Sequence, residues 1–132
     1  MSEARVKETL TKFEEVIDNH SANLGQLENM LAINVIDLDR CHRLLKRIRR
    51  TRREIYEGMK TIVENIGGVV DRQTREESIG IISYLGMVGL KDELELLKGL
   101  QDVMKKNGES IDINDDVKQI MELMDMASKL SF

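Results

Sequence analysis

The chain has 132 residues, of which 41% are hydrophobic and 33% charged, with a formal net charge of −4. It has no proline and only 3% aromatic residues, which argues against a β-sandwich or barrel, because turns and strand cores recruit those residues. The hydrophobic content excludes a disordered chain, and no apolar run of about 18 residues predicts a membrane span. Without a signal-peptide pattern, and with Cys41 as its one cysteine, the protein is expected in the cytoplasm, away from membranes.

The first helix is predicted from a heptad pattern of apolar residues that begins at Val6. The steps between these residues alternate between four and three, which is typical of a helix that packs along a partner helix. His20 is the one polar interruption of this seam. Its apolar members are Val6, Leu10, Phe13, Ile17, Leu24, Leu27 and Leu31.

A second seam with the same steps follows, and Arg52 is its one polar interruption. The connection at 32–37 is short enough to make the two helices antiparallel neighbours, each about 40 Å long. The two seams face each other if each residue of the first helix lies opposite the residue of the second helix whose number brings the sum of the two numbers to 69. Residues 1–66 are therefore predicted to form a long, coiled-coil-like helical hairpin that ends at Gly67-Gly68. The apolar members of the second seam are Leu38, Cys41, Leu45, Ile48, Ile55, Met59, Ile62 and Ile66.

The two polar interruptions, His20 and Arg52, fall at nearly the same level of the hairpin. We interpret them as a polar layer that fixes the register, with Arg52 paired to a neighbour such as Asp18 or Glu14. A functional His–Arg site is the alternative interpretation, although nothing nearby in the predicted hairpin supplies a nucleophile.

The region 67–132 is predicted to contain two or three shorter helices. Thr74 and Glu77 have the spacing of a capping box and open an apolar run. The run contains Gly80, Gly86 and Gly89, which indicate either close helix–helix approach or a bend near Gly89.

An amphipathic helix is expected next at 90–106, ended by Asn107-Gly108, and then a last helix capped by Asn114 or Asp115. We expect these helices to pack on the hairpin as an all-α bundle, giving one compact domain.

The second helix carries eight basic residues between Arg40 and Arg53, with no acidic residue among them. Since the net charge is −4, the rest of the chain carries −12. The heptad positions place six of the eight on the outer face, where like charges at helical spacing repel one another. Local stability therefore does not explain them. We call these six residues the basic stripe: Arg40, Arg43, Lys46, Arg47, Arg50 and Arg53.

The basic stripe has three interpretations. Acidic residues elsewhere in the chain or in a sister subunit cover it, or it docks on an acidic patch of another protein, or it contacts nucleic-acid phosphates. The lack of aromatic residues within the stripe, of an RNA-binding signature and of a net positive charge weighs against nucleic acid. An oligomer that sequesters an anionic small ligand is a further alternative. The acidic candidates for covering it are Glu93, Glu95, Asp115, Asp116, Glu122 and Asp125.

Two histidines and Cys41 do not provide the clustered ligands of a metal site, and no nucleophile–base arrangement can be identified. Cys41 lies on the second seam and is interpreted as a small core residue. We therefore expect no metal, no cofactor and no enzymatic activity.

The segments 34–40 and 45–54 resemble small helical-hairpin bacteriophage accessory proteins, in which a short loop leads into an arginine-rich helix. The resemblance covers residues 1 to about 66, transfers no functional residue, and implies an accessory protein that acts by binding. Our hypothesis is a non-enzymatic, homo-oligomeric helical protein that binds a macromolecular partner, such as a phage-encoded inhibitor of a host or defence protein in the host cytoplasm. The alternative is a nucleic-acid-binding accessory factor that uses the basic stripe.

Overall fold

The computed structural model describes residues 2–33 and 36–130, and within them it contains helices and no strand, which confirms the all-α class. Residue 1, residues 131 and 132, and Asn34 and Val35 of the segment 34–40 lie outside the described part. The elements in order are α1 (Ser2–Leu31), α2 (Leu38–Asn65), the 3-10 turn η1 (Ile66–Gly68), α3 (Arg72–Tyr84), the π-helical turn η2 (Leu85–Gly89), α4 (Leu90–Lys106) and α5 (Asn114–Ser128).

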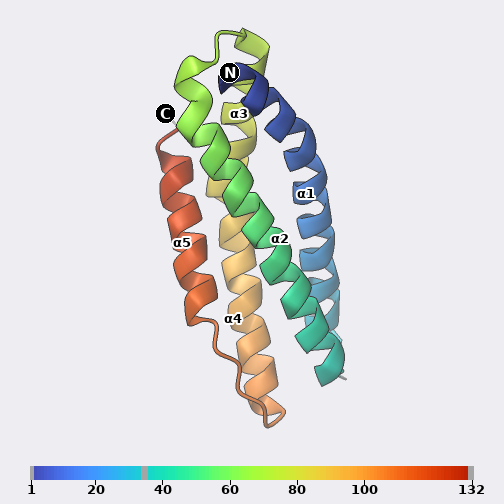
Figure 1. Cartoon of the computed structure of the whole chain (residues 1–132). Coiled ribbons are helices and arrows are strands. Elements are labelled where there is room, and N and C mark those ends of the chain that lie inside the picture. Colours follow the sequence, from blue (N-terminus) through green and yellow to red (C-terminus); the bar gives the residue numbers. More distant parts are fainter. Residues whose placement is uncertain (1, 34–35, 131–132) are drawn as a thin grey trace.

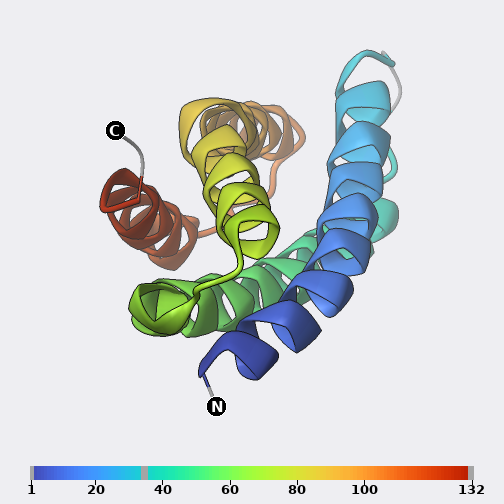
Figure 2. The ribbon, with the colours of Figure 1, turned by 90° about the horizontal axis from the view of Figure 1, so that it is seen from above.

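Helices α1 and α2 form the predicted antiparallel pair (Figure 1), and seen from above they cross rather than run parallel (Figure 2). Asp37 caps α2, because its carboxylate accepts a hydrogen bond from the Arg40 amide at 3.1 Å. The Phe13 ring lies over Gly58, and His20 meets Thr51, so these pairs sum to 71 instead of the predicted 69. The large ring finds room over the glycine, and the crossing shifts by about one residue in each helix.

Helices α3 and α4 are joined through η2 into one continuous rod, and Figure 1 shows them end to end. A bend near Gly89 was one of the two expectations. The helix instead continues through Gly89, and a π-helical turn accommodates one extra residue there. Close helix approach, the other expectation, is found at Gly86. A Cβ atom there would lie 2.7 Å from the Cβ of Ala127 on α5, so only glycine fits.

Both predicted N-caps in the second half are wrong. Asp71 caps α3, because its carboxylate accepts hydrogen bonds from the amide of Thr74 at 3.2 Å and from its hydroxyl at 2.6 Å. Helix α5 has Ile113 at its N-cap, and the Asp112 carboxylate accepts a bond from the Asn114 amide at 2.9 Å. In each case an aspartate just before the helix reaches the free amides first.

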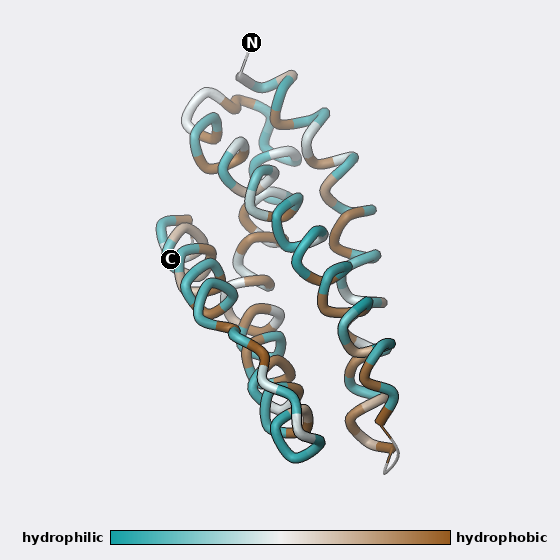
Figure 3. Tube along the Cα trace, turned by 60° about the horizontal axis from the view of Figure 1, so that its bottom comes forward, coloured by the Kyte–Doolittle hydropathy of each residue, from teal (hydrophilic) through white to brown (hydrophobic). Residues whose placement is uncertain are grey.

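The four rods α1, α2, α3–α4 and α5 run alternately down and up the bundle (Figure 1). Hydrophobic and hydrophilic segments alternate along each rod (Figure 3), as expected for helices with one apolar side facing a shared core. The carboxylate of Glu3 accepts bonds from the amides of Val70 and Asp71, which ties the start of α1 to the α2–α3 connection. Among the described residues, no helix is long and apolar enough to cross a membrane.

Candidate functional site

Each of the four rods carries one strongly polar residue at a position of its apolar seam, and the four meet at one level of the bundle. In the α3–α4 rod, Glu93 stands in a row with Leu90, Leu97, Leu100 and Met104. In α5, Asp116 stands in a row with Ile120, Leu123 and Ala127. The exposed fractions are 4% for His20, 2% for Arg52, 1% for Glu93 and 2% for Asp116.

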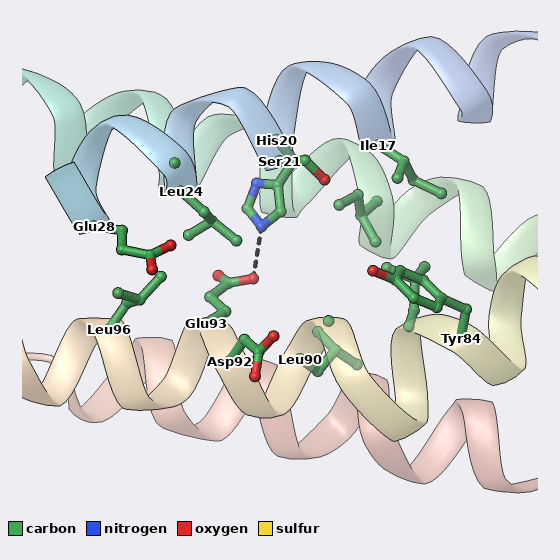
Figure 4. A pocket seen from close by; sticks show the side chains of 14 residues that line it. Ile17, His20, Ser21, Leu24, Glu28, Tyr84, Leu90, Asp92, Glu93 and Leu96 are labelled. Carbon is green, nitrogen blue, oxygen red and sulfur yellow. Dashed lines mark hydrogen bonds and ion pairs between the residues drawn. The ribbon is translucent and has the colours of Figure 1, made fainter.

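Glu93 connects the two residues predicted to form a polar layer. Its Oε1 lies 2.6 Å from Nε2 of His20 (Figure 4), and its Oε2 accepts a bond of 2.6 Å from Nε of Arg52. The other ring nitrogen of His20, Nδ1, lies 2.5 Å from the Thr51 hydroxyl. That hydroxyl also reaches backbone carbonyls of α2 at 3.1 and 3.2 Å. The Thr51 hydroxyl can therefore donate a hydrogen bond to Nδ1 or accept one from it. His20 thus keeps both of its hydrogen-bond partners whether or not Nδ1 carries a hydrogen.

Asp116 holds the other side of Arg52. Its Oδ1 accepts a hydrogen bond of 2.7 Å from Nη1 of Arg52. Arg49 donates two further hydrogen bonds to the same carboxylate, from Nε at 3.0 Å and from Nη2 at 2.8 Å. Burial alone would raise the pKa of Asp116, but the bonds from Arg49 and Arg52 outweigh burial and hold this pKa below its ordinary value. The hydrogen bond to Asp116 likewise raises the pKa of Arg49.

These residues form what we call the buried charge network: His20, Arg49, Thr51, Arg52, Glu93 and Asp116. The expected partners of Arg52 were wrong. Asp18 and Glu14 are exposed on α1, whereas the Arg52 guanidinium points between α4 and α5 to Glu93 and Asp116. The hairpin alone could not reveal this, because both acids come from the other half of the chain.

One nitrogen of the network, Nη2 of Arg52, is buried and has no hydrogen-bond acceptor among the described residues. A surface hollow next to the network is lined by Arg49, Arg52, Arg53, Asp112, Asp115, Asp116 and Gln119. Three arginines are matched there by three aspartates, so the hollow has no excess of positive charge with which to attract an anion.

The chain Thr51–His20–Glu93 has the residue types of a hydroxyl nucleophile, a base and an orienting carboxylate. The geometry does not present the hydroxyl to a substrate. Thr51 is 5% exposed and is absent from the lining of the pocket that His20 and Glu93 border, and Glu93 already serves Arg52. Cys41 is fully buried, and burial raises the pKa of its thiol, which disfavours the reactive thiolate.

The structure places the basic stripe on the outside of α2, with all six residues exposed. None of their side chains makes a hydrogen bond or ion pair within the described part of the chain. Of the acids proposed to cover them, Glu93 and Asp116 are committed to the buried charge network. The other four, Glu95, Asp115, Glu122 and Asp125, are exposed and form no ion pair with the stripe. Among the described residues, no acid of the same chain therefore forms an ion pair with the stripe.

Sequence reasoning missed Glu93, Asp116 and Thr51 as members of the site. The signal was present, because positions 90, 93, 97, 100 and 104 repeat the steps of three and four, with Glu93 as the interruption. Positions 113, 116, 120, 123 and 127 do the same around Asp116. Leu94 of the same helix is only half-buried, so the row that contains Glu93 is the one that faces the core.

Comparison with protein-family models, with curated proteins and with solved structures gave no match to this chain.

Proposed function

We propose that this chain is a non-enzymatic binding protein whose basic stripe docks on an acidic surface of a partner protein. The observation that supports it is six exposed cations on one side of α2 without an ionic partner among the described residues. Like charges at helical spacing oppose the helix that carries them. An acidic partner relieves that repulsion, and complementary charge accelerates the encounter.

The stripe is presented on a well-anchored scaffold. From Arg40 to Arg53 it extends about 20 Å along the helix. The opposite side of α2 is held by the apolar core and, through Arg52, by Glu93 and Asp116. A surface that is already ordered loses little backbone entropy on binding. A phage-encoded inhibitor of a host or defence protein is one concrete form of such a binding protein.

The two alternatives fit less well. Nucleic-acid phosphates would also neutralise the stripe, but no aromatic side chain lies within it to stack on bases. The remainder of the chain carries −12 and repels a polyanion that extends beyond the stripe. For an anionic small ligand, the hollow beside Arg52 offers balanced charges.

The test uses a variant in which four stripe residues, Arg43, Lys46, Arg47 and Arg50, are all changed to Glu. The control changes four exposed lysines of α4 to Glu (Lys91, Lys98, Lys105 and Lys106), which alters the net charge equally. Probes are a labelled poly-glutamate peptide, a DNA duplex and single-stranded DNA and RNA, at about 50 mM and about 200 mM salt. We expect the peptide to bind wild type and control, and to lose binding to the stripe variant.

Three outcomes contradict the proposal. Tighter binding of nucleic acid than of the peptide, with affinity falling steeply as salt rises, establishes the nucleic-acid alternative. Unfolding of the stripe variant, seen by circular dichroism, would show that the fold itself requires the stripe residues. Equal peptide binding by the stripe variant and the control shows that the stripe is not the binding surface.

Homo-oligomerisation remains a separate prediction of this proposal. Size-exclusion chromatography with light scattering measures it directly. We expect a mass above that of one chain, and a strict monomer at all concentrations contradicts the prediction.

A further inference from the structure

A groove runs along the bundle between α1 and the α3–α4 rod. Its centre is a pocket of about 180 Å³ beside the His20–Glu93 pair (Figure 4). Hollows continue from this pocket in both directions, sharing Ile17 and Tyr84 with it on one side and Leu96 on the other. Buried residues such as Ile55 of α2 reach the floor, so the groove opens on the side of α2 away from the basic stripe.

The apolar seam of α1 is only partly covered by its own chain. One of its two heptad positions (Val6, Phe13, His20 and Leu27) is buried. At the other position Leu10 is also buried, whereas Ile17, Leu24 and Leu31 are half-buried and line the groove. The facing wall adds Ile81 and Leu96, both half-buried, and Tyr84, which is 59% exposed. A heptad row of this kind is complementary to another helix.

The rims of the groove are acidic on both sides. All of the rim acids are exposed, and none of them makes an ion pair within the described residues. Among the described residues, no lysine or arginine lines any of these three hollows. The rim acids are Glu14, Asp18 and Glu28 on α1, and Asp92 and Glu95 on α4.

We propose that this groove binds an amphipathic helix of a partner protein, with an apolar stripe that fills the groove and lysine or arginine along both flanks. The apolar stripe would cover Ile17, Leu24 and Leu31, and the flanking cations would face the rim acids. A helix of about 18 residues is about 27 Å long and covers this row of hollows. Helix-in-groove recognition of this type takes its affinity from apolar anchors and its orientation from flanking charges.

A second copy of this chain is a poorer occupant. Pairing two grooves symmetrically would place acidic rims against acidic rims, which repel. The outward positions of the basic stripe carry only charged side chains, so the stripe of a second copy offers no apolar row to fill the groove. The charge of the rims and the apolar walls together therefore select a basic amphipathic helix from another protein.

The probe is a fluorescent helical peptide of about 18 residues with leucine at heptad positions a and d and lysine elsewhere. A scrambled peptide of the same composition keeps the charge and loses the apolar stripe. Fluorescence anisotropy with the full chain measures both affinities. We expect the patterned peptide to bind at least about tenfold more tightly than the scrambled one.

One variant fills the groove and one reverses its rims. A Cβ atom at Gly25 meets nothing within 4 Å, so Gly25→Leu fits into the groove without disturbing the core. Its control is Ala22→Leu, at an exposed position of α1 outside the lining. The second variant combines Asp18→Lys, Glu28→Lys and Asp92→Lys. Its control of equal charge combines Asp102→Lys, Glu122→Lys and Asp125→Lys, at exposed positions away from the groove.

We expect Gly25→Leu and the rim variant each to weaken peptide binding by at least about tenfold, with the controls near wild type and the helical content unchanged. The proposal is overturned if the two peptides bind equally, if the patterned peptide does not bind, or if neither variant differs from its control. A wild-type dimer that Gly25→Leu abolishes would assign the groove to a second copy and overturn the proposal as well.

Discussion

Arginines on the two sides of α2 are in opposite situations. Arg52 is 2% exposed and contacts two carboxylates, whereas Arg47, five residues earlier, is exposed and has no ionic partner within the described residues. The two side chains have the same chemistry, and their heptad position decides the difference. The comparison shows that the basic segment of α2 contains an inner set that belongs to the fold and an outer set that has no ionic partner within the described residues.

The inner side is costly to disturb, because removing one partner strands a buried charge. Replacing a whole buried ion pair with apolar residues often leaves the free energy of unfolding unchanged. The role of such a network is therefore better explained by its fixing the register of the helices than by its stabilising the fold. Four rods that each place one polar residue at the same level support this explanation, since sliding any rod by one turn would bury an unpaired charge.

The largest effect is expected from Glu93→Ala. It leaves buried His20 without its carboxylate and buried Arg52 with Asp116 alone, and should lower the free energy of unfolding by about 3–5 kcal/mol. Urea denaturation followed by circular dichroism measures it. The control is Glu95→Ala, an exposed acid on the same helix, which should change the free energy by no more than about 0.5 kcal/mol. Similar values for the two variants contradict the assignment of Glu93 to the buried charge network.

A complementary variant separates register from stability. Leucine at His20, Arg52, Glu93 and Asp116 together removes the charges of the layer and leaves no charge stranded on the seam. We expect the free energy of unfolding of this variant to be no lower than that of wild type. A loss as large as that of Glu93→Ala would show that the charged layer itself stabilises the fold.

An intermediate effect is expected from Asp116→Asn, and it should depend on pH. The substitution removes the charge that holds Arg49 and Arg52, which should cost about 2 kcal/mol at neutral pH. Because the pKa of Asp116 is lower in the folded chain than its usual 3.8, the contribution of the carboxylate is present above pH 3.8 and is lost as the pH falls through the folded value. Urea titrations across this range should show the two proteins converging in acid, and a difference independent of pH contradicts this.

The smallest effect is expected on the outer side. Arg47→Gln removes repulsion from Arg43 and Arg50, one turn away in each direction, and should raise the free energy of unfolding by about 0.2–0.5 kcal/mol. Thermal unfolding of wild type and variant at low salt measures it, and added salt should shrink the difference. A clear destabilisation would show that Arg47 has a structural partner and would remove the contrast between the two sides of α2.

The helices were predictable because each depends on a local pattern. The bounds of α4 at 90–106, its end at Asn107-Gly108 and the end of α2 before Gly67-Gly68 follow from amphipathicity and glycine. The capping aspartates Asp37 and Asp71 had the right residue type, but choosing between neighbouring caps depends on backbone angles that spacing does not give. The π-helical turn was beyond prediction, since it depends on how the α3–α4 rod fits against Ala127.

The sequence by itself determined an all-helical chain, a hairpin with one polar interruption in each helix and an outward-facing basic stripe, because periodicity fixes which side of a helix is apolar. Only the tertiary structure decided that Glu93 and Asp116, more than 40 residues beyond Arg52, are its partners, and that part of the α1 seam lines an open groove. Pairing between rods depends on their relative height and rotation, and those are set by packing across the whole core rather than by any one segment.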